Sequence, residues 1–190
     1  IEEPEQKQEV FFDAERDITP GDWKLIKEKV EKRKKDGLEV SAEVAMAKVI
    51  NPDLDHGLSE KDLEATRQEI KGCRSRTDWN GLWRLTMNLK IIDPLHKPDL
   101  TDADWQREMK KISALKDEKN WRELSGQAME VKIIDPDRVL YIDKETWDGM
   151  KKHLEKLRTE ADWLNFSSHA MRMKMVDPHV NLNLNEGDWQ

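Results

Sequence analysis

Residues 121–136 read WRELSGQAMEVKIIDP, and the pattern of this stretch returns at a fixed interval along the chain. Its closing step, an acidic or amide residue followed by proline, occurs four times with a spacing of 42 residues, at Asn51-Pro52, Asp93-Pro94, Asp135-Pro136 and Asp177-Pro178. A large apolar residue follows each proline by eleven residues, at Leu63, Trp105, Trp147 and Trp189. A fixed period of this length predicts a tandem array of repeats.

Each repeat is predicted to contain two helices. In the second helix Trp121 is followed at helical spacing by Leu124 and Ala128. The proline ends this helix, because the residue before a proline is pushed out of the α region. The first helix opens with side chains suited to an N-cap, namely Thr19, Ser59, Thr101, Asp143 and Asn185. The second helix is the more apolar one, so we expect it to lie inside, covered by the charged first helix.

The chain is therefore predicted to be all-α, with tandem two-helix (αα-hairpin) repeats that form a short α-solenoid or a compact helical array. The repeats are expected at residues 18–52, 53–94, 95–136 and 137–178, and the first repeat is shorter than the others. We expect the acidic residues 1–17 to form a flexible lead-in. Residues 179–190 are expected to be the start of a fifth unit or a C-terminal cap.

The composition restricts the classes of function. Charged residues make up 38% of the 190 residues and the formal net charge is −7, so we expect no nucleic-acid binding, which needs a basic surface. No apolar run approaches the roughly 20 residues of a membrane-spanning helix, and we expect no membrane insertion. The single cysteine, Cys73, excludes an intramolecular disulfide. An exported and a cytoplasmic location both stay open, as does the oligomeric state.

One inter-repeat loop is similar to an EF-hand calcium loop. Asn51, Asp53, Asp55, Ser59 and Asp62 fall at ligand positions 1, 3, 5, 9 and 12 of such a loop. A histidine stands where the sharp-turn glycine belongs, and proline occupies position 2. A simpler explanation is that the Asn-Pro step ends one helix and Ser-x-x-Asp caps the next. A degenerate calcium-binding module is therefore the first alternative to a role without metal.

The chain lacks the common catalytic motifs. It contains no G-x-S-x-G, P-loop, G-x-G-x-x-G or H-E-x-x-H pattern. Its five histidines show no H-x-x-x-H spacing and do not join the cysteine in a zinc pattern. With 40 acidic residues some carboxylates approach one another by chance, so an acidic dyad is not excluded by counting. An enzyme of unknown type is the second alternative, and no catalytic residue or cofactor is assigned.

The recurring tryptophans are expected to pack between repeats, because they stand at one structural position, usually directly after aspartate. Trp83 differs from them. It occurs only in the second unit, where the equivalent residues are Ser41, Ser125 and Ser167. Trp83 is therefore the candidate for a contact surface, with a local variation of the core as the other interpretation.

The repeat resembles units in uncharacterised bacterial proteins built of tandem tryptophan-containing helix pairs. The resemblance is carried by residues 163–178, WLNFSSHAMRMKMVDP, and by residues 90–94, KIIDP, and it covers about residues 18–190. It implies a bacterial origin but no activity, cofactor or site residue. Helical repeats present extended surfaces, so we expect a non-catalytic scaffold or binding module for another macromolecule, with protein as the partner.

Overall fold

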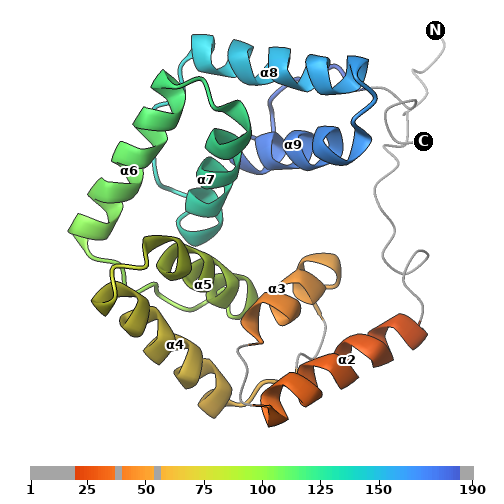
Figure 1. Cartoon of the computed structure of the whole chain (residues 1–190), viewed down its shortest axis with the longest axis vertical. Helices are drawn as coiled ribbons and strands as arrows, with labels where there is room; N and C mark the ends of the chain where they lie inside the picture. Colours follow the sequence, from red (N-terminus) through yellow and green to blue (C-terminus); the bar gives the residue numbers. More distant parts are fainter. Residues whose placement is uncertain (1–19, 37–39, 54–56, 185–190) are drawn as a thin grey trace, which may run out of the picture.

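The computed structural model describes residues 20–36, 40–53 and 57–184 of the chain. This described part contains eight α-helices and no strand, which confirms the all-α prediction (Figure 1). In chain order the helices are α2 (Pro20–Lys35), α3 (Ser41–Ile50), α4 (Glu60–Ser75), α5 (Trp79–Ile92), α6 (Asp102–Asp117), α7 (Trp121–Ile134), α8 (Lys144–Thr159) and α9 (Trp163–Val176).

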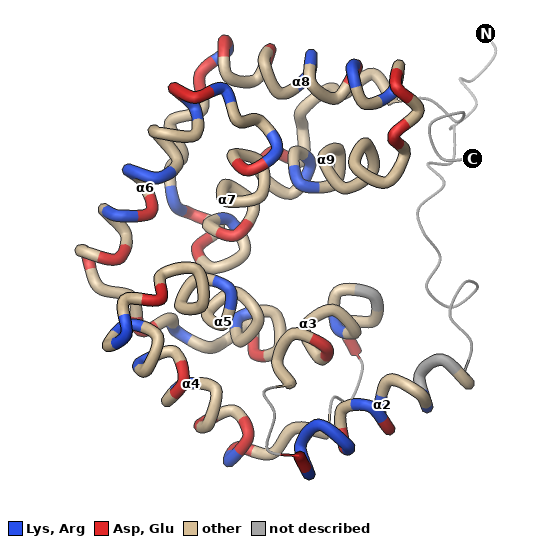
Figure 2. Tube along the Cα trace, in the orientation of Figure 1, with Lys and Arg blue, Asp and Glu red and all other residues tan. Residues whose placement is uncertain are grey.

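The helices form two layers. The inner helices α3, α5, α7 and α9 pack side by side in chain order, and the outer helices α2, α4, α6 and α8 cover them. Figure 1 shows the outer helices following the convex rim of a curved array, with α3 and α9 at the two ends of the inner row. Figure 2 shows charged residues dense along α2, α4, α6 and α8 and sparse along α9, as expected for an exposed layer over a buried one.

Side-chain caps begin the outer helices α4, α6 and α8 where the sequence predicts them. Ser59 and Thr101 each form a capping box with the aspartate three residues later. Asp143 accepts a hydrogen bond from the backbone N–H of Thr146 at 2.9 Å. These three predicted N-caps are confirmed, whereas Thr19 and Asn185 lie outside the described residues, as do residues 1–17 and the last six residues of the chain.

The two helices of a hairpin are joined by a very short turn. Thr77, Lys119 and Ala161 stand 42 residues apart and have φ of +59°, +55° and +55°. In each turn the next residue, for example Asp162, donates its backbone N–H to a carbonyl five residues earlier, here that of Leu157 at 3.0 Å. This is the Schellman arrangement that ends a helix, although glycine usually occupies the positive-φ position. Asp162 then caps α9, so one residue ends a helix and starts the next.

The Asp-Pro step acts as a helix stop. Asp93 adopts a non-helical conformation as the C-cap of α5, and its side chain accepts the backbone N–H of Leu95 at 3.2 Å. A lysine four residues before each proline donates to that proline's carbonyl at 2.5 to 3.2 Å, in the pairs Lys48–Pro52, Lys90–Pro94, Lys132–Pro136 and Lys174–Pro178. The lysines hold the loop against the negative end of the helix that it leaves.

A second set of basic residues joins neighbouring outer helices. Lys34 Nζ lies 3.2 Å from Asp62 Oδ2, and Arg74 Nη2 lies 2.9 Å from Asp104 Oδ2. At the equivalent place Lys116 contacts the carboxylate of Asp143. Each of these acids belongs to the cap of the following outer helix, so the ion pairs connect neighbouring repeats at equivalent places.

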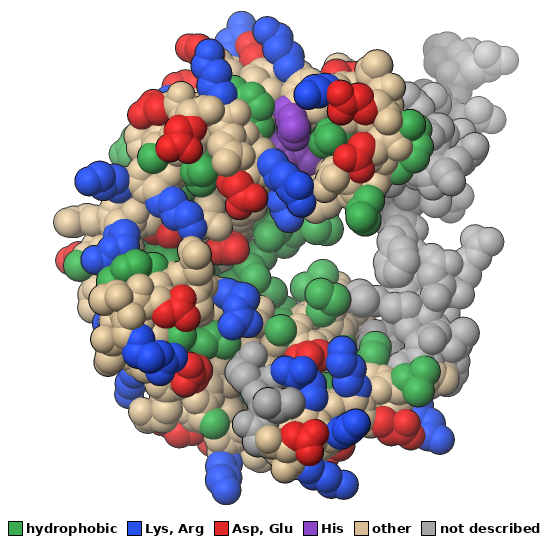
Figure 3. Space-filling model, in the orientation of Figure 1, with side chains coloured by type: hydrophobic (Ala, Val, Ile, Leu, Met, Phe, Trp, Pro, Cys, Tyr) green, Lys and Arg blue, Asp and Glu red, His purple; other side chains and the backbone are tan. Residues whose placement is uncertain are grey.

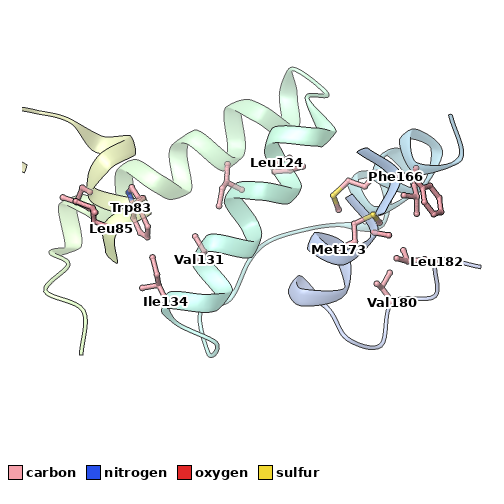
Figure 4. Close-up of a cluster of buried hydrophobic side chains, with 14 of the residues drawn as sticks. Trp83, Leu85, Leu124, Val131, Ile134, Phe166, Met173, Val180 and Leu182 are labelled. Carbon is pink, nitrogen blue, oxygen red and sulfur yellow. The ribbon is translucent and has the colours of Figure 1, made fainter. Parts of the chain in front are cut away.

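The buried apolar side chains form one large cluster and one small one. The large cluster runs from α5 through α7 and α9 into the loop that follows α9 (Figure 4). The small cluster contains Val30, Val40, Val44, Ala45 and Ile92 and belongs mainly to the first repeat. Core formation by contacts between adjacent repeats is what an array requires, since one hairpin cannot bury its apolar face alone.

Candidate functional site

The inner row begins with α3 and ends with α9. Each of these two helices has one side on which no further described inner helix packs. Asn88 Nδ2 of α5 points back to α3, donating to Ser41 Oγ at 3.2 Å. Arg172 of α9, two repeats later, likewise contacts the preceding inner helix, because it donates to a backbone carbonyl of α7 at 3.3 Å. Met46 occupies the same repeat position in α3. Met46 therefore lies on the side of α3 that faces away from α5, which we call the free face of α3.

The other end of the row is α9. Ser125 of α7 meets His169 of the next inner helix, with Ser125 Oγ 2.9 Å from His169 Nδ1. Ser167 of α9 occupies the repeat position of Ser125, and Leu164 lies one turn before it. Leu164 and Ser167 therefore lie on the side of α9 that faces away from α7, which we call the free face of α9.

Apolar side chains are exposed on the two terminal inner helices. Met46 of α3 is 68% exposed and Leu164 of α9 is 83% exposed. The other exposed large apolar residues of these helices are Val49, Trp163, Met171 and Met175. Figure 3 shows an opening between α3 and the α7–α9 pair, with hydrophobic side chains on both of its sides. Exposed apolar groups gathered in this way are typical of an interaction site.

A polar cavity of about 150 Å³ lies between α7, α8 and α9. Its lining comprises Arg122, His153, Leu157, Asp162, Asn165, Ser168, His169 and Arg172. Figure 3 shows histidine side chains at the surface between α8 and α9, with basic side chains beside them. His153 and His169, sixteen residues apart in sequence, meet here edge to face with ring centroids 5.1 Å apart.

His169 is held as a neutral side chain. It is 2% exposed, and its Nε2 lies 3.3 Å from the Met150 carbonyl, which can only accept a hydrogen bond. Nε2 therefore carries the proton, which leaves Nδ1 as an acceptor 2.9 Å from Ser125 Oγ; the Ser125 hydroxyl also lies 2.9 Å from the Arg122 carbonyl, a second acceptor. Burial, together with the nearby His153 and Arg172, lowers the pKa of His169 to about 4. Burial also lowers the pKa of His153.

The Ser125–His169 pair does not have the arrangement of an activated nucleophile. Ser125 is 1% exposed, so its hydroxyl does not face the cavity opening. A carbonyl, not a carboxylate, receives the second imidazole nitrogen, which leaves the pair without the acid that orients and stabilises a catalytic imidazolium. The pair is best understood as a satisfied polar contact between two inner helices.

The space between α5, α6 and α7, one repeat earlier, corresponds to this cavity but is lined by acidic and amide side chains. Glu108 of α6 is 2% exposed, and among the described residues its Oε1 has no hydrogen-bond partner. Burial raises the pKa of Glu108 to about 7, while the nearby Lys111 lowers it and Glu130 raises it. The pKa of Glu130 is raised as well, again first by burial. Gln127 Oε1, at the repeat position of His169, is also buried without a partner in the described part of the chain.

The contact-surface prediction for Trp83 is wrong. Trp83 is 2% exposed and packs edge to face against Trp105, with centroids 5.0 Å apart. Because α5 lies between α3 and α7 and under α4, the Trp83 position is covered from several sides. Trp79, Trp105 and Trp121 are partly buried against the core, as expected for packing residues, but Trp163 is 47% exposed.

The described residues of the calcium-like loop have structural partners. Asn51 Oδ1 accepts the backbone N–H of Asp53 at 3.2 Å. Asp62 Oδ2 accepts the backbone N–H of Ser59 at 2.8 Å and its hydroxyl at 2.7 Å, and it also pairs with a lysine. Asp55 lies outside the described residues. The side chains of Asn51, Ser59 and Asp62 therefore serve the helix stop and the capping box that the simpler explanation predicts.

Other candidate chemistries have little support within the described ranges. No group of three or more histidine, cysteine or acidic side chains in residues 20–36, 40–53 and 57–184 is placed to hold a metal ion. Cys73 is buried, and burial together with Asp78 and Glu69 raises the pKa of its thiol, so the thiol stays protonated. None of the helices described has the length and apolar character needed to cross a bilayer.

No protein-family model matches the chain, and neither a curated protein nor a solved structure is similar to it. The bacterial origin implied by the resemblance of the repeats remains a prediction.

Sequence reasoning missed the cavity because its lining comes from three helices. A comparison of repeat positions gives the only available signal. Arg122, His153 and Arg172 stand where the preceding repeat has Asn80, Lys111 and Glu130. The preceding repeat thus has an amide, a cation and an acid at these three positions, whereas the cavity has two arginines and a histidine.

Proposed function

We propose that the chain is a non-catalytic helical-repeat module that binds another protein, and that the partner docks an apolar helical segment against the free faces of α3 and α9. The proposal is supported above all by the exposed apolar residues of these two helices, which include Met46 and Leu164. The outer helices, in contrast, carry mostly charged residues.

Continuity with the internal packing supports a helix as the docking element. Inside the array each inner helix packs along the next one, as α5 does with α3 and α7 does with α9. A partner helix on a free face would repeat this packing, with apolar anchors at helical spacing. Burying one large apolar side chain contributes about 1.5–3 kcal/mol, so a few anchors suffice for specific binding.

The polar sites favour binding over catalysis. The buried pair Ser125–His169 lacks an acid partner, and the described atoms of the calcium-like loop serve turns and caps. We therefore retain protein binding over both alternatives, the calcium module and the enzyme.

Selection from a random-peptide display library tests the proposal without knowledge of the natural partner. Peptides selected on the wild-type chain are compared for binding to the double variant Met46→Glu/Leu164→Glu. The matched control is Leu95→Glu/Val139→Glu, which changes two equally apolar, exposed loop residues. We expect the first variant to weaken binding by about tenfold or more, because a buried apolar contact is replaced by a charge. Equal binding to both variants would refute the assignment of the surface.

A further inference from the structure

The arginines of the cavity between α7, α8 and α9 differ in their partners from seven other arginines of the described chain. Arg33, Arg67, Arg74, Arg76, Arg107, Arg138 and Arg158 each lie within 4.0 Å of a carboxylate oxygen. Arg122 and Arg172 form no such ion pair with any described residue. In a chain with a net charge of −7, two guanidinium groups without a carboxylate partner at one cavity are an unbalanced positive site.

Neutral donors complete this cavity. Within the described ranges the Ser168 hydroxyl and the His153 imidazole make no hydrogen bond, and both line the cavity. Asp162 also lines it, but its two oxygens accept the backbone N–H and the side-chain amide of Asn165 at 3.3 and 2.7 Å. The lining thus carries two guanidinium groups and one carboxylate, which leaves the cavity with an excess positive charge.

The equivalent place one repeat earlier shows that packing does not require two arginines. There Lys111 Nζ donates to Asn80 Oδ1 at 3.2 Å, and Glu130 stands at the position of Arg172. The equivalent helices there pack without two arginines. The paired arginines of the cavity between α7, α8 and α9 are therefore not a requirement of the packing and can serve a ligand.

We propose that Arg122, Arg172, His153 and Ser168 form a binding site for an oxyanion, either a phosphate or a carboxylate group. Guanidinium groups bind such planar or tetrahedral oxyanions through paired hydrogen bonds. A cavity of about 150 Å³ is large enough for one oxyanionic group. This site uses residues of α9 that line the cavity with α7 and α8, whereas the docking face proposed for α9 faces away from α7.

The test is a titration of the full chain with sodium phosphate, followed by NMR of the imidazole Cε1–H resonances of His153 and His169. Sodium chloride at matched ionic strength is the reference. We expect a saturable shift of the His153 resonance, weakened about tenfold in Arg122→Gln and in Arg172→Gln, since each removes a charge-assisted hydrogen bond. Arg67→Gln is the matched control, because it removes a guanidinium from the exposed face of α4, and it should leave the titration unchanged.

Shifts that do not saturate, or shifts that persist equally in Arg122→Gln and Arg172→Gln, overturn the proposal. A second arm separates the two sources of the anion. A phosphoserine peptide that binds more tightly than inorganic phosphate, with no binding of its serine counterpart, assigns the site to an anionic group on a protein. Equal or weaker binding of the phosphopeptide assigns it to a free anion.

Discussion

Replacing Glu108 with glutamine should stabilise the protein in neutral and alkaline solution. Glu108 is 2% exposed and its Oε1 has no hydrogen-bond partner among the described residues, so ionisation places an unpaired charge in the core. Glutamine keeps the shape of the protonated acid and cannot ionise. The substitution therefore isolates the cost of the charge.

The magnitude follows from the pKa. Glu108 has a folded-state pKa of about 7 against an ordinary value of 4.5. Between these pH values the folded state keeps a proton that the unfolded state has lost, so stability falls as pH rises. A shift of this size corresponds to about 3 kcal/mol at about 1.4 kcal/mol per pKa unit. We expect Glu108→Gln to exceed the wild type by up to that amount at about pH 8 and to equal it near pH 4.

His169 produces the opposite slope. Its folded-state pKa is about 4, below the ordinary 6.5, so stability is lost as pH falls through this window. Between pH 4.5 and pH 6.5 the titration of Glu108 lowers the free energy of unfolding as pH rises, and the titration of His169 raises it. In Glu108→Gln the free energy of unfolding should therefore rise with pH in this range, and in His169→Gln it should fall.

Urea unfolding followed by tryptophan fluorescence, at a series of pH values from about 4 to about 8, measures these differences. Glu118→Gln, a change of an exposed glutamate just after α6, is the matched control and should give a curve parallel to the wild type. A Glu108→Gln curve parallel to the wild type across the whole range would refute the reasoning, because Glu108 would then titrate alike in the folded and unfolded states.

Three further predictions concern two glycines, one turn between helices and the calcium-like loop. Gly149→Ala should destabilise the protein by about 1–3 kcal/mol, because the added Cβ would lie 2.4 Å from the ring of Trp121. Gly126→Ala, whose added Cβ would have no neighbour closer than 3.6 Å, should raise the melting temperature, because alanine has the better helix propensity. Ala161→Gly should stabilise by up to about 1 kcal/mol, since glycine relieves the positive φ of that turn; a lower melting temperature would contradict this. Millimolar calcium should not shift the thermal melt, because Asp62 serves its capping box and a lysine; a saturable rise in melting temperature would instead support the calcium alternative.

The sequence predicts much of the fold because the determinants of its helices are local. A capping serine or threonine starts an outer helix, an Asp-Pro step ends an inner one, and apolar spacing selects the buried face. The turns within hairpins were harder to foresee, since Thr77, Lys119 and Ala161 adopt positive φ without being glycine. Their conformation is imposed by the Schellman hydrogen bonds on either side.

The candidate sites were less predictable because they depend on contacts between helices. Trp83 could not be placed inside or outside before its neighbours were known, and it lies inside against Trp105. His153 and His169 belong to different helices and meet only after the last hairpin closes. The lysines that hold the Pro loops, such as Lys90, are regular in sequence, but only the folded loop shows what they bind.

Protein binding by the free faces of α3 and α9 can be measured by hydrogen–deuterium exchange of the chain, alone and with a peptide selected on it. Binding should slow exchange in α3 and α9 and leave the outer helices α4 and α6 unchanged. Slower exchange confined to α4 and α6, with α3 and α9 unaffected, would contradict the account.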